Sequence, residues 1–212
     1  MGYQPYLDLI ADLTAGKELI ASGMTQEVDR CRAALACAAA GRVVALISSG
    51  DAGIYGMAGL AIELAEAEKL AVAIEVIPGV TAASAAAAAL GAPLMLDFAV
   101  ISLSDLLVPW ATIRARLEAV AGADFAVALY NPRSKRRISQ LDEAVAIFRA
   151  TRPGTTPAGI ATAVGQADQA LCVTDLDHLL EQEITMRSVV LVGNSATRLI
   201  DGRMVTARGY AV

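Results

Sequence analysis

Residues 43–59 read VVALISSGDAGIYGMAG, a continuous apolar run followed by a loop that carries Gly50, Gly53 and Gly56. An apolar run that ends at a glycine is typical of a parallel strand buried on both faces. The apolar residues that follow, from Met57 to Ala65, recur at a helical period. This stretch therefore predicts a strand, a loop and a helix, which is the repeating unit of an α/β fold.

The same alternation continues on the C-terminal side of this unit. Helices are predicted after Thr81 as far as Gly91, over 111–121 and over 138–150. Strands are predicted over 72–77, 98–103, 124–130, 158–162, 170–174 and 189–195, with a last edge strand at 204–206. We expect an α/β fold of two domains, 1–104 and 105–212, each with a largely parallel sheet. The junction is placed at 103–109, where the periodicity is least regular.

Composition excludes several classes of protein. The chain has 212 residues, 56% of them hydrophobic, and a net charge of −5, so it lacks the basic footprint of a general nucleic-acid binder. Its most apolar stretch, 80–96, contains Thr81, Ser84 and Pro93 and falls short of the ~20 apolar residues of a membrane span. The N-terminus has no basic region typical of a signal peptide. Three cysteines without CxxC spacing indicate reduced thiols and a cytoplasmic location, and a single histidine removes most metal sites.

Four polar, mostly glycine-containing loops follow predicted strands. In open α/β sheets ligands bind at the carboxyl ends of strands, where loop amides and helix N-termini converge. Each loop taken alone could simply be a tight turn, since glycine permits one. Together the four favour a ligand-binding cleft. The loops are SSGDAGIYG (48–56), PGVTAAS (78–84), YNPRSKRR (130–137) and VGNSATR (192–198).

The first two loops fit no common nucleotide motif. The glycine spacing is GxxGxxG rather than GxGxxG, and the chain has no GxxxxGK[ST], so the dinucleotide fingerprint and the P-loop are both excluded. Asp51 could bond ribose hydroxyls or lie near a cationic ligand. It could equally make an Asx turn or cap a helix. Thr81 could present its hydroxyl to a ligand, although its spacing favours a helix cap.

The third loop carries the one basic cluster of this acidic chain: Arg133, Lys135, Arg136 and Arg137. Such a cluster predicts an anionic partner. The alternative is a solvated face at a helix start, but cations there oppose the helix dipole, which favours the functional interpretation. His178, with acidic neighbours, fits a surface or helix-start position better than a catalytic base. Cys172 alternates within a strand, which predicts a core position.

Taken together, five strings carry a more specific signal than any one loop, and by them the chain resembles the tetrapyrrole (precorrin) methylase family. The likeness runs from Tyr3 to Tyr210. Within the family it is greatest to the branch that methylates precorrin-3B at C17 during contraction of the ring. The strings are SSGDAGIYGMAG, IPGVTAASAAAAALGAPL, DFAVISLSDLLVPW, ALYNPRSKRR and VVLVGNSATR.

The resemblance implies an S-adenosylmethionine-dependent C-methyltransferase of cobalamin biosynthesis, a homodimer whose cofactor cleft lies between two α/β domains. The substrate would be a polycarboxylate tetrapyrrole, which gives the basic cluster a partner. Methyl transfer of this kind requires no metal. The implied cofactor-binding residues are Gly50, Asp51, Ala52, Tyr55, Thr81, Ala82, Tyr130, Asn131 and the loop Ala161 to Val164. The implied substrate-facing residues are Ser102, Ser104, Arg133 and Arg137. Asp105 is the candidate acid or base.

The chain also departs from the family pattern. The family opens with a strand and a GxGPG loop ahead of the position that matches Gly2, and no stretch here matches them. We therefore expect the first sheet to lack its central strand, through a late start codon, a truncation or a piece supplied otherwise. Thr162-Ala163 stands where this branch usually has Arg-Asn. Two alternatives stay open: a methylase of another ring position, and a truncated pseudo-enzyme that binds tetrapyrrole or only dimerises.

Overall fold

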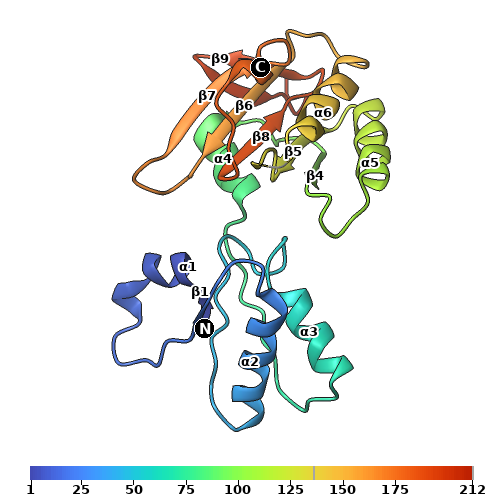
Figure 1. The fold of residues 1–212 in the computed structure, drawn as a ribbon. Coiled ribbons are helices and arrows are strands. Elements are labelled where there is room, and N and C mark those ends of the chain that lie inside the picture. Colours follow the sequence, from blue (N-terminus) through green and yellow to red (C-terminus); the bar gives the residue numbers. More distant parts are fainter. Residues whose placement is uncertain (136, 212) are drawn as a thin grey trace. The chain divides into compact units, whose positions relative to one another are not determined.

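The computed structural model describes residues 1–135 and 137–211, which form two compact units, Met1–Thr81 and Ala82–Val212 (Figure 1). The division does not coincide with the expected boundary at 104/105. Strand β4 (Phe98–Ser102) pairs along its whole length with β5 (Ala126–Tyr130), and these backbone hydrogen bonds place β4 in the second unit.

The first unit consists of short elements. Strands β1 (Gly2–Tyr3) and β2 (Ala21–Ser22) pair in parallel, and a parallel bridge joins Gly2 to Ile47. Its helices bury small apolar side chains such as Cys31 and Ala61. These helices are α1 (Gln4–Leu9), the 3-10 turn η1 (Ala11–Leu13), α2 (Glu27–Ala39) and α3 (Ala58–Ala67).

The two strands that the sequence predicts in this unit are not formed. Residues 43–49 carry only the bridge at Ile47, residues 72–77 carry no β-pairing, and Figure 1 draws both without arrows. The prediction that residues 43–49 are buried on both faces is wrong as well, because Val43 is 105% exposed. The physical reason is pairing: a buried parallel strand needs a neighbour on each edge, and the described residues supply only Met1–Tyr3.

The second unit holds a five-stranded sheet in the order β4-β5-β8-β6-β7 and a three-stranded sheet in the order β3-β10-β9. The remaining strands are β3 (Gly91–Ala92), β6 (Pro157–Thr162), β7 (Ala170–Asp175), β8 (Ser188–Val192), β9 (Thr197–Ile200) and β10 (Arg203–Thr206). The helices are α4 (Ala82–Leu90), α5 (Trp110–Gly122), α6 (Ser139–Arg149) and the 3-10 turn η2 (Leu179–Glu181). Strand β10 pairs on both sides, so it is not the edge strand that was expected.

The α/β class is confirmed, but the larger sheet is mixed rather than largely parallel. Only β4 and β5 pair in parallel, whereas β5-β8, β8-β6 and β6-β7 are antiparallel. The connection from β6 to β7 is a loop without a helix. A parallel pair of neighbouring strands needs a long crossover, usually a helix, and α5 joins β4 to its neighbour β5 in this way.

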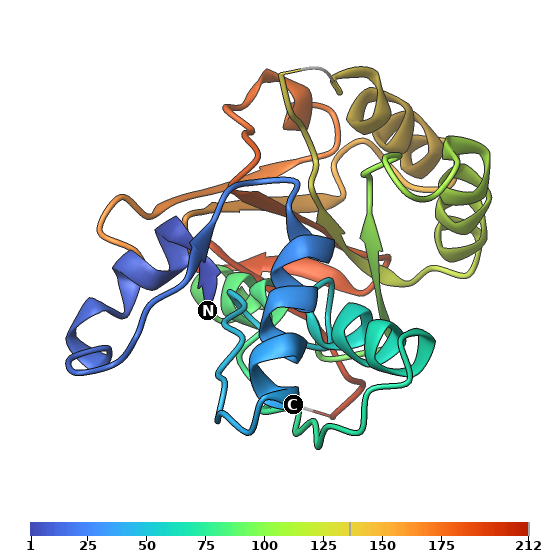
Figure 2. The ribbon, with the colours of Figure 1, turned by 60° about the horizontal axis from the view of Figure 1, so that its bottom comes forward.

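Both faces of the larger sheet are covered. Val127 and Leu129 of β5 pack into a core with Phe148 and Leu117, whereas Ala128 packs into a second core with Leu90. Successive side chains of a strand point to opposite faces, so the two cores lie on opposite sides of the sheet. Helices α5 and α6 lie side by side on one face (Figure 2), and α4 covers the other.

Within the part of the chain that the structure describes, no helix combines the length and the apolar character that a bilayer crossing requires.

Candidate functional site

In the first unit, Asp51 joins two of the predicted ligand loops. One carboxylate oxygen accepts a hydrogen bond from the backbone N–H of Gly53 (2.8 Å) and the other from the backbone N–H of Gly79 (2.9 Å). The first bond is the Asx turn that the sequence left open, and the second ties residues 50–56 to residues 78–81. Both glycines are exposed. The carboxylate offers about four acceptor positions, so it can still accept bonds from a ligand.

The two loops are in main-chain contact. A Cβ built on Gly79 would lie 2.1 Å from the carbonyl oxygen of Gly50, a separation that no side chain allows. Gly50 itself has a φ of 69°, and Tyr55 adopts a φ of 54°. Glycine at position 79 is therefore a packing requirement that brings the ends of two predicted strands together.

Hydrogen bonds from the N–H groups of Gly79 and Gly53 lower the pKa of the Asp51 carboxyl below its ordinary value of 3.8. Such bonds favour the charged form of a carboxyl group. Asp51 is thus an anion at neutral pH, at the ends of segments that are otherwise apolar.

In the second unit, the residues that follow the parallel pair β4-β5 form one connected cluster. The Tyr130 hydroxyl accepts a hydrogen bond from the backbone N–H of Ala83 in the first turn of α4 (2.7 Å). The Asn131 side chain donates to the Ser102 hydroxyl (3.0 Å). Asn131 has a φ of 51°, a conformation that asparagine tolerates better than most residues. Because β4 and β5 run in parallel, their carboxyl ends bring these predicted residues to one edge of the sheet.

The described arginines of the basic cluster already have protein partners. Arg137 donates to the backbone carbonyl of Asn131 (2.7 Å) and to the Ser104 hydroxyl (3.5 Å). Arg133 forms an ion pair with Asp142 in the first turn of α6 (2.9 Å). The interpretation as a simple solvated helix face therefore fails for Arg137, which closes the loop onto the end of β4.

The other members of that cluster differ. Lys135 is exposed, and Arg136 lies outside the described residues. Asp105 accepts a hydrogen bond from the side chain of Gln140 (2.8 Å) and is exposed.

Four of the predicted cofactor residues meet in one apolar cluster of the second unit. Tyr130, Ala82 and Val164 are half-buried and pack against a core that includes Ala161. Ala161 is 1% exposed, so its side chain belongs to this core. Ala163 has a φ of 52°, in the left-handed region, where the side chain of an alanine strains the backbone.

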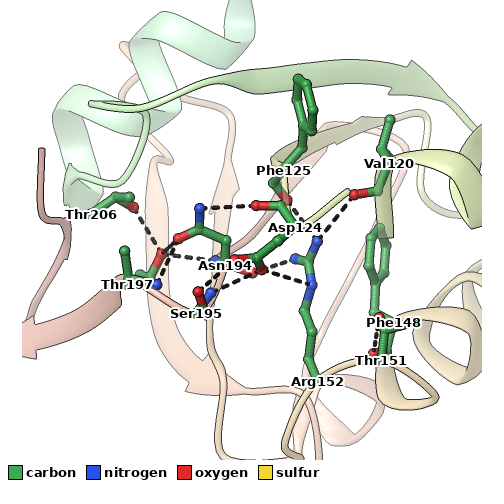
Figure 3. Close-up of polar contacts among 12 residues, drawn as sticks. Val120, Asp124, Phe125, Phe148, Thr151, Arg152, Asn194, Ser195, Thr197 and Thr206 are labelled. Atoms are coloured by element: carbon green, nitrogen blue, oxygen red, sulfur yellow. Dashed lines mark hydrogen bonds and ion pairs between the residues drawn. The ribbon is translucent and has the colours of Figure 1, made fainter. Parts of the chain in front are cut away.

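The fourth loop lies at the opposite end of the larger sheet from the third, so these two loops do not share the ligand-binding cleft that the sequence favoured. Strand β8 is antiparallel to β5, and Val192 pairs with Val127 near the beginning of β5. The loop after β8 serves the fold there: the side chain of Asn194 donates to the backbone carbonyl of Asp124 (3.0 Å), and Ser195 bonds the carboxylate of Asp124 (Figure 3).

Sequence reasoning missed a buried arginine beside this loop. Arg152 is 6% exposed and donates to the backbone carbonyls of Gly193 and Phe125. Its guanidinium lies over the Phe148 ring, 4.9 Å from the ring centre, and faces Asp124 at 3.9 Å (Figure 3). Burial lowers the pKa of Arg152. A lone arginine between a helix and a proline carries no sequence signal for such a role.

The remaining candidates do not join either cluster. His178 is exposed, immediately precedes η2 and pairs with Asp175 (2.7 Å), whose hydrogen bond raises the pKa of His178. Cys172 is half-buried and packs beside the core of the second unit. Across residues 1–135 and 137–211, no group of three or more His, Cys, Asp or Glu side chains could hold a metal ion.

Comparison with known proteins gives one consistent result. Residues 3–180 match the family described as Tetrapyrrole (Corrin/Porphyrin) Methylases. The chain is 47% identical to a probable cobalt-factor III C(17)-methyltransferase of Salmonella typhimurium, over 100% of the chain and 88% of that protein. It is 41% identical to a precorrin-3B C(17)-methyltransferase of Sinorhizobium, over 99% of the chain and 85% of that protein. The crystal structure of the methyltransferase CobJ matches with a TM-score of 0.91 and 42% identity, covering 97% of this chain and 87% of that one.

Proposed function

Since the chain belongs to the tetrapyrrole methylase family, we propose that it is an S-adenosylmethionine-dependent C-methyltransferase of corrin biosynthesis that methylates C17 of precorrin-3B or cobalt-factor III. The observation that carries the proposal is the 47% identity to a C(17)-methyltransferase along the full chain. The names of the relatives leave both substrates open, one with cobalt and one without.

The loops of the first unit supply groups that suit this cofactor. Its sulfonium provides an electrophilic methyl group, and its ribose and amino-acid parts carry hydroxyl and ammonium donors. Asp51 is an anion with acceptor positions to spare, and Gly53 and Gly79 leave the backbone beside it open to a ligand. We assign Gly50, Asp51, Ala52, Tyr55 and Thr81 to cofactor binding in this unit.

The cluster after β4 and β5 supplies the second set of groups. Tyr130 and Asn131, together with Ala82, Ala161 and Val164, are assigned to the cofactor as well. Tyr130 positions the first turn of α4, and Asn131 is fixed by its bond to Ser102. These residues orient the cofactor and exclude water, which is what an in-line methyl transfer requires of a protein.

We assign Ser102, Ser104, Arg133 and Arg137 to the tetrapyrrole carboxylates. Arg137 reaches Ser104 and Arg133 is 23% exposed at its side chain, so both remain near the surface that a flat polycarboxylate would cover. Asp105, which is held by Gln140, is the proposed proton donor or acceptor for ring contraction.

The experiment has two stages. Calorimetric titration of S-adenosylhomocysteine into the purified chain measures cofactor binding. Incubation with S-adenosylmethionine and either cobalt-factor III or precorrin-3B, followed by mass spectrometry, then measures methyl transfer. Gain of one methyl group, located at C17 by NMR, supports the proposal; gain at another carbon supports a methylase of different ring position.

A second candidate is a tetrapyrrole-binding protein without catalysis. The incompletely paired segment 43–47 and the segment 72–77, which has no β-pairing, favour it, because both lead directly into the proposed cofactor loops. Tetrapyrrole binding without measurable S-adenosylhomocysteine binding would select this candidate over the enzyme.

We also infer a cytoplasmic homodimer, from the unpaired cysteines and from the Ala-rich, apolar composition together with the family likeness. Sedimentation velocity at micromolar concentration tests the dimer, and a monomer there would contradict it.

A further inference from the structure

The loop that joins β6 to β7, residues 163–169, continues the stretch Ala161 to Val164 that is assigned to the cofactor (Figure 1). Val164 is half-buried and packs against the apolar core that includes Ala161. The rest of the loop, residues 165–169, is exposed. Apolar packing thus fixes the beginning of the loop, and the conformation of the rest depends on polar contacts.

The backbone of this loop bends sharply. Ala163 has a φ of 52° and Gly165 a φ of 79°, both in the left-handed region. The N–H of Gln166 donates to the carbonyl of Ala163 (3.0 Å), and the N–H of Gly165 donates to the side-chain oxygen of Gln169 (2.8 Å). A residue other than glycine is strained in this region and keeps its conformation only where its surroundings hold it. The strain at Ala163 therefore points to a contact that holds the loop from outside.

Arg187, the residue before β8, makes such a contact. Its backbone carbonyl accepts a hydrogen bond from the N–H of Ala163 (3.1 Å). Its guanidinium donates to both carboxylate oxygens of Asp168 (2.6 and 2.9 Å) and to the side-chain oxygen of Gln166 (2.6 Å). A guanidinium that binds both oxygens of a carboxylate fixes its direction as well as its distance. Arg187 thus holds the loop at its first residue and again near its end.

The sheet fixes the position of Arg187 itself. The next residue, Ser188, is 2% exposed and pairs with Thr162 in the β6-β8 ladder, and the hydroxyls of these two residues bond at 2.7 Å. The N–H of Arg187 donates to the Thr185 hydroxyl (3.2 Å), and the N–H of Thr185 donates to the Ser188 hydroxyl (2.9 Å). The guanidinium therefore extends from a firmly held strand end to an exposed loop.

Global stability does not explain this ion pair. The side chains of Arg187 and Asp168 are 52% and 62% exposed, and a pair so exposed contributes little to the free energy of unfolding. The hydrogen bond from Arg187 lowers the pKa of Asp168, so both groups are charged at neutral pH. The effect of the pair is local, because it holds one exposed loop in one conformation.

We propose that Arg187 is a positioning residue for the cofactor: with Asp168 and Gln166, it holds residues 163–169 in the conformation that binds the cofactor. The proposal rests on the proposed function, which assigns Val164 to the cofactor. A loop that is ordered in advance loses less conformational entropy on binding, so the affinity rises without any contact between the arginine and the ligand. Because the ion pair is exposed, dissolved salt weakens it, and cofactor affinity should fall as salt rises.

The test compares the full chain with its Arg187→Gln variant. Calorimetry measures the affinity for S-adenosylhomocysteine, hydrogen exchange measures the order of the loop, and thermal denaturation measures stability. We expect the variant to bind S-adenosylhomocysteine about three- to fivefold more weakly. The amides of Gly165 and Gln166 should exchange faster, while the amides of β6 and the melting temperature stay unchanged. The variant should also show less salt dependence of cofactor affinity than the wild type.

Further variants separate positioning from a general loss of charge. Arg187→Lys keeps the charge but loses the planar fork, so its affinity should lie between those of wild type and Arg187→Gln. Arg187→Asp combined with Asp168→Arg restores an ion pair in the opposite orientation, and it should bind more tightly than either single variant. The matched control is Arg149→Gln, whose arginine is also 52% exposed and pairs with Asp177 in the same unit. It should change neither the affinity nor the exchange of the loop.

The outcomes distinguish this proposal from the proposed function. If S-adenosylhomocysteine failed to bind the wild type, the proposed function would be contradicted, and this proposal with it. If it bound the wild type and Arg187→Gln equally well, this proposal alone would be overturned. Unchanged exchange of the loop amides in Arg187→Gln would overturn it too. So would weaker binding that came with a lower melting temperature and faster exchange throughout β6 and β8, because Arg187 would then only stabilise the unit.

Discussion

The carboxylate of Asp51 accepts a hydrogen bond from the backbone N–H of Gly79, 28 residues further along the chain, at 2.9 Å. The bond joins the loop of residues 50–56 to residues 78–81. One side chain thus fixes the spacing of two backbone segments at the proposed cofactor site.

Replacing Asp51 tests this joint role. Asp51→Ala removes both accepted hydrogen bonds, so exchange at the Gly53 and Gly79 amides should accelerate, and S-adenosylhomocysteine should bind about tenfold or more weakly. Asp51→Asn retains one carbonyl acceptor and should be intermediate in both measurements. Unchanged affinity of Asp51→Ala, with faster exchange, would reduce Asp51 to a turn residue.

The same bond gives a pH dependence of definite sign. The pKa of Asp51 is lowered in the folded chain by the N–H groups of Gly79 and Gly53. Its contribution to stability is therefore complete above the unfolded pKa, about 3.9, and is lost as the pH falls through the lower folded value. Acid titration should open the Gly79 amide to exchange in wild type. Asp51→Asn should show no such step.

Arg133→Gln with Arg137→Gln tests the assignment to tetrapyrrole carboxylates. Each lost charge-assisted hydrogen bond is worth roughly 1.5–3 kcal/mol where the pair is desolvated, and much less where it is exposed. Tetrapyrrole affinity at low salt should fall, while S-adenosylhomocysteine affinity should barely change. Wild-type binding should also weaken as salt rises.

The matched control is Arg114→Gln, an exposed arginine of α5 that pairs with Glu118. Since Arg137 also closes its own loop, each variant is compared at equal folded fraction by circular dichroism. If the double variant bound the tetrapyrrole at low salt as tightly as wild type does, the assignment of these arginines to the substrate would be wrong.

Arg152→Met should destabilise the second unit strongly. The change leaves the carbonyls of Gly193 and Phe125 without their donor in a buried place, which costs about 3 kcal/mol in the free energy of unfolding. Urea denaturation measures the loss. Arg149→Met, which removes an exposed pair with Asp177, should change stability by less than about 1 kcal/mol. Similar losses for the two variants would contradict the role given to Arg152.

Ala163→Gly should stabilise the chain. Ala163 has a φ of 52°, where an L-side chain is strained by roughly 1–2 kcal/mol, and glycine is not. Part of the gain is offset by the greater freedom of glycine in the unfolded chain, so a net rise of about 0.5–1 kcal/mol is expected. Ala161→Gly, in the regular strand β6, should lower stability instead. A loss at position 163 would mean that the methyl group packs favourably despite the strain.

Most elements of the second unit could be predicted, because the apolar patterns of its strands and helices are visible in the local sequence. Every strand predicted between 98 and 206 is formed, and α5 and α6 lie within one or two residues of their predicted bounds. Strands β3 and β9 were not predicted, however, and neither was the direction of the strands. The pattern of VVLVGNS is the same for a parallel and an antiparallel strand, so Asn194 and Ser195 were placed at the wrong end of the sheet.

In the first unit, by contrast, the two strands predicted from the sequence are not formed. Residues 43–49 and 72–77 have strand sequences, but pairing is a property of neighbours that a local pattern does not contain. The loops after them were nevertheless identified, since Gly50, Asp51 and Gly79 carry their own turn chemistry. Asp51 was left with two interpretations, and the structure supports the turn directly while leaving acceptor positions for a ligand.

The two units differ in how much of their backbone is paired in sheets, and this difference affects how cooperatively the chain unfolds. The second unit has a five-stranded sheet with both faces covered, whereas the strand pairing described in the first is limited to two residue pairs and one bridge. Regions with few paired backbone groups open at low free energy. Heating or denaturant should therefore melt the first unit ahead of the second, in two transitions rather than one. A protease that samples these openings should trim the chain to a resistant fragment that begins near Ala82.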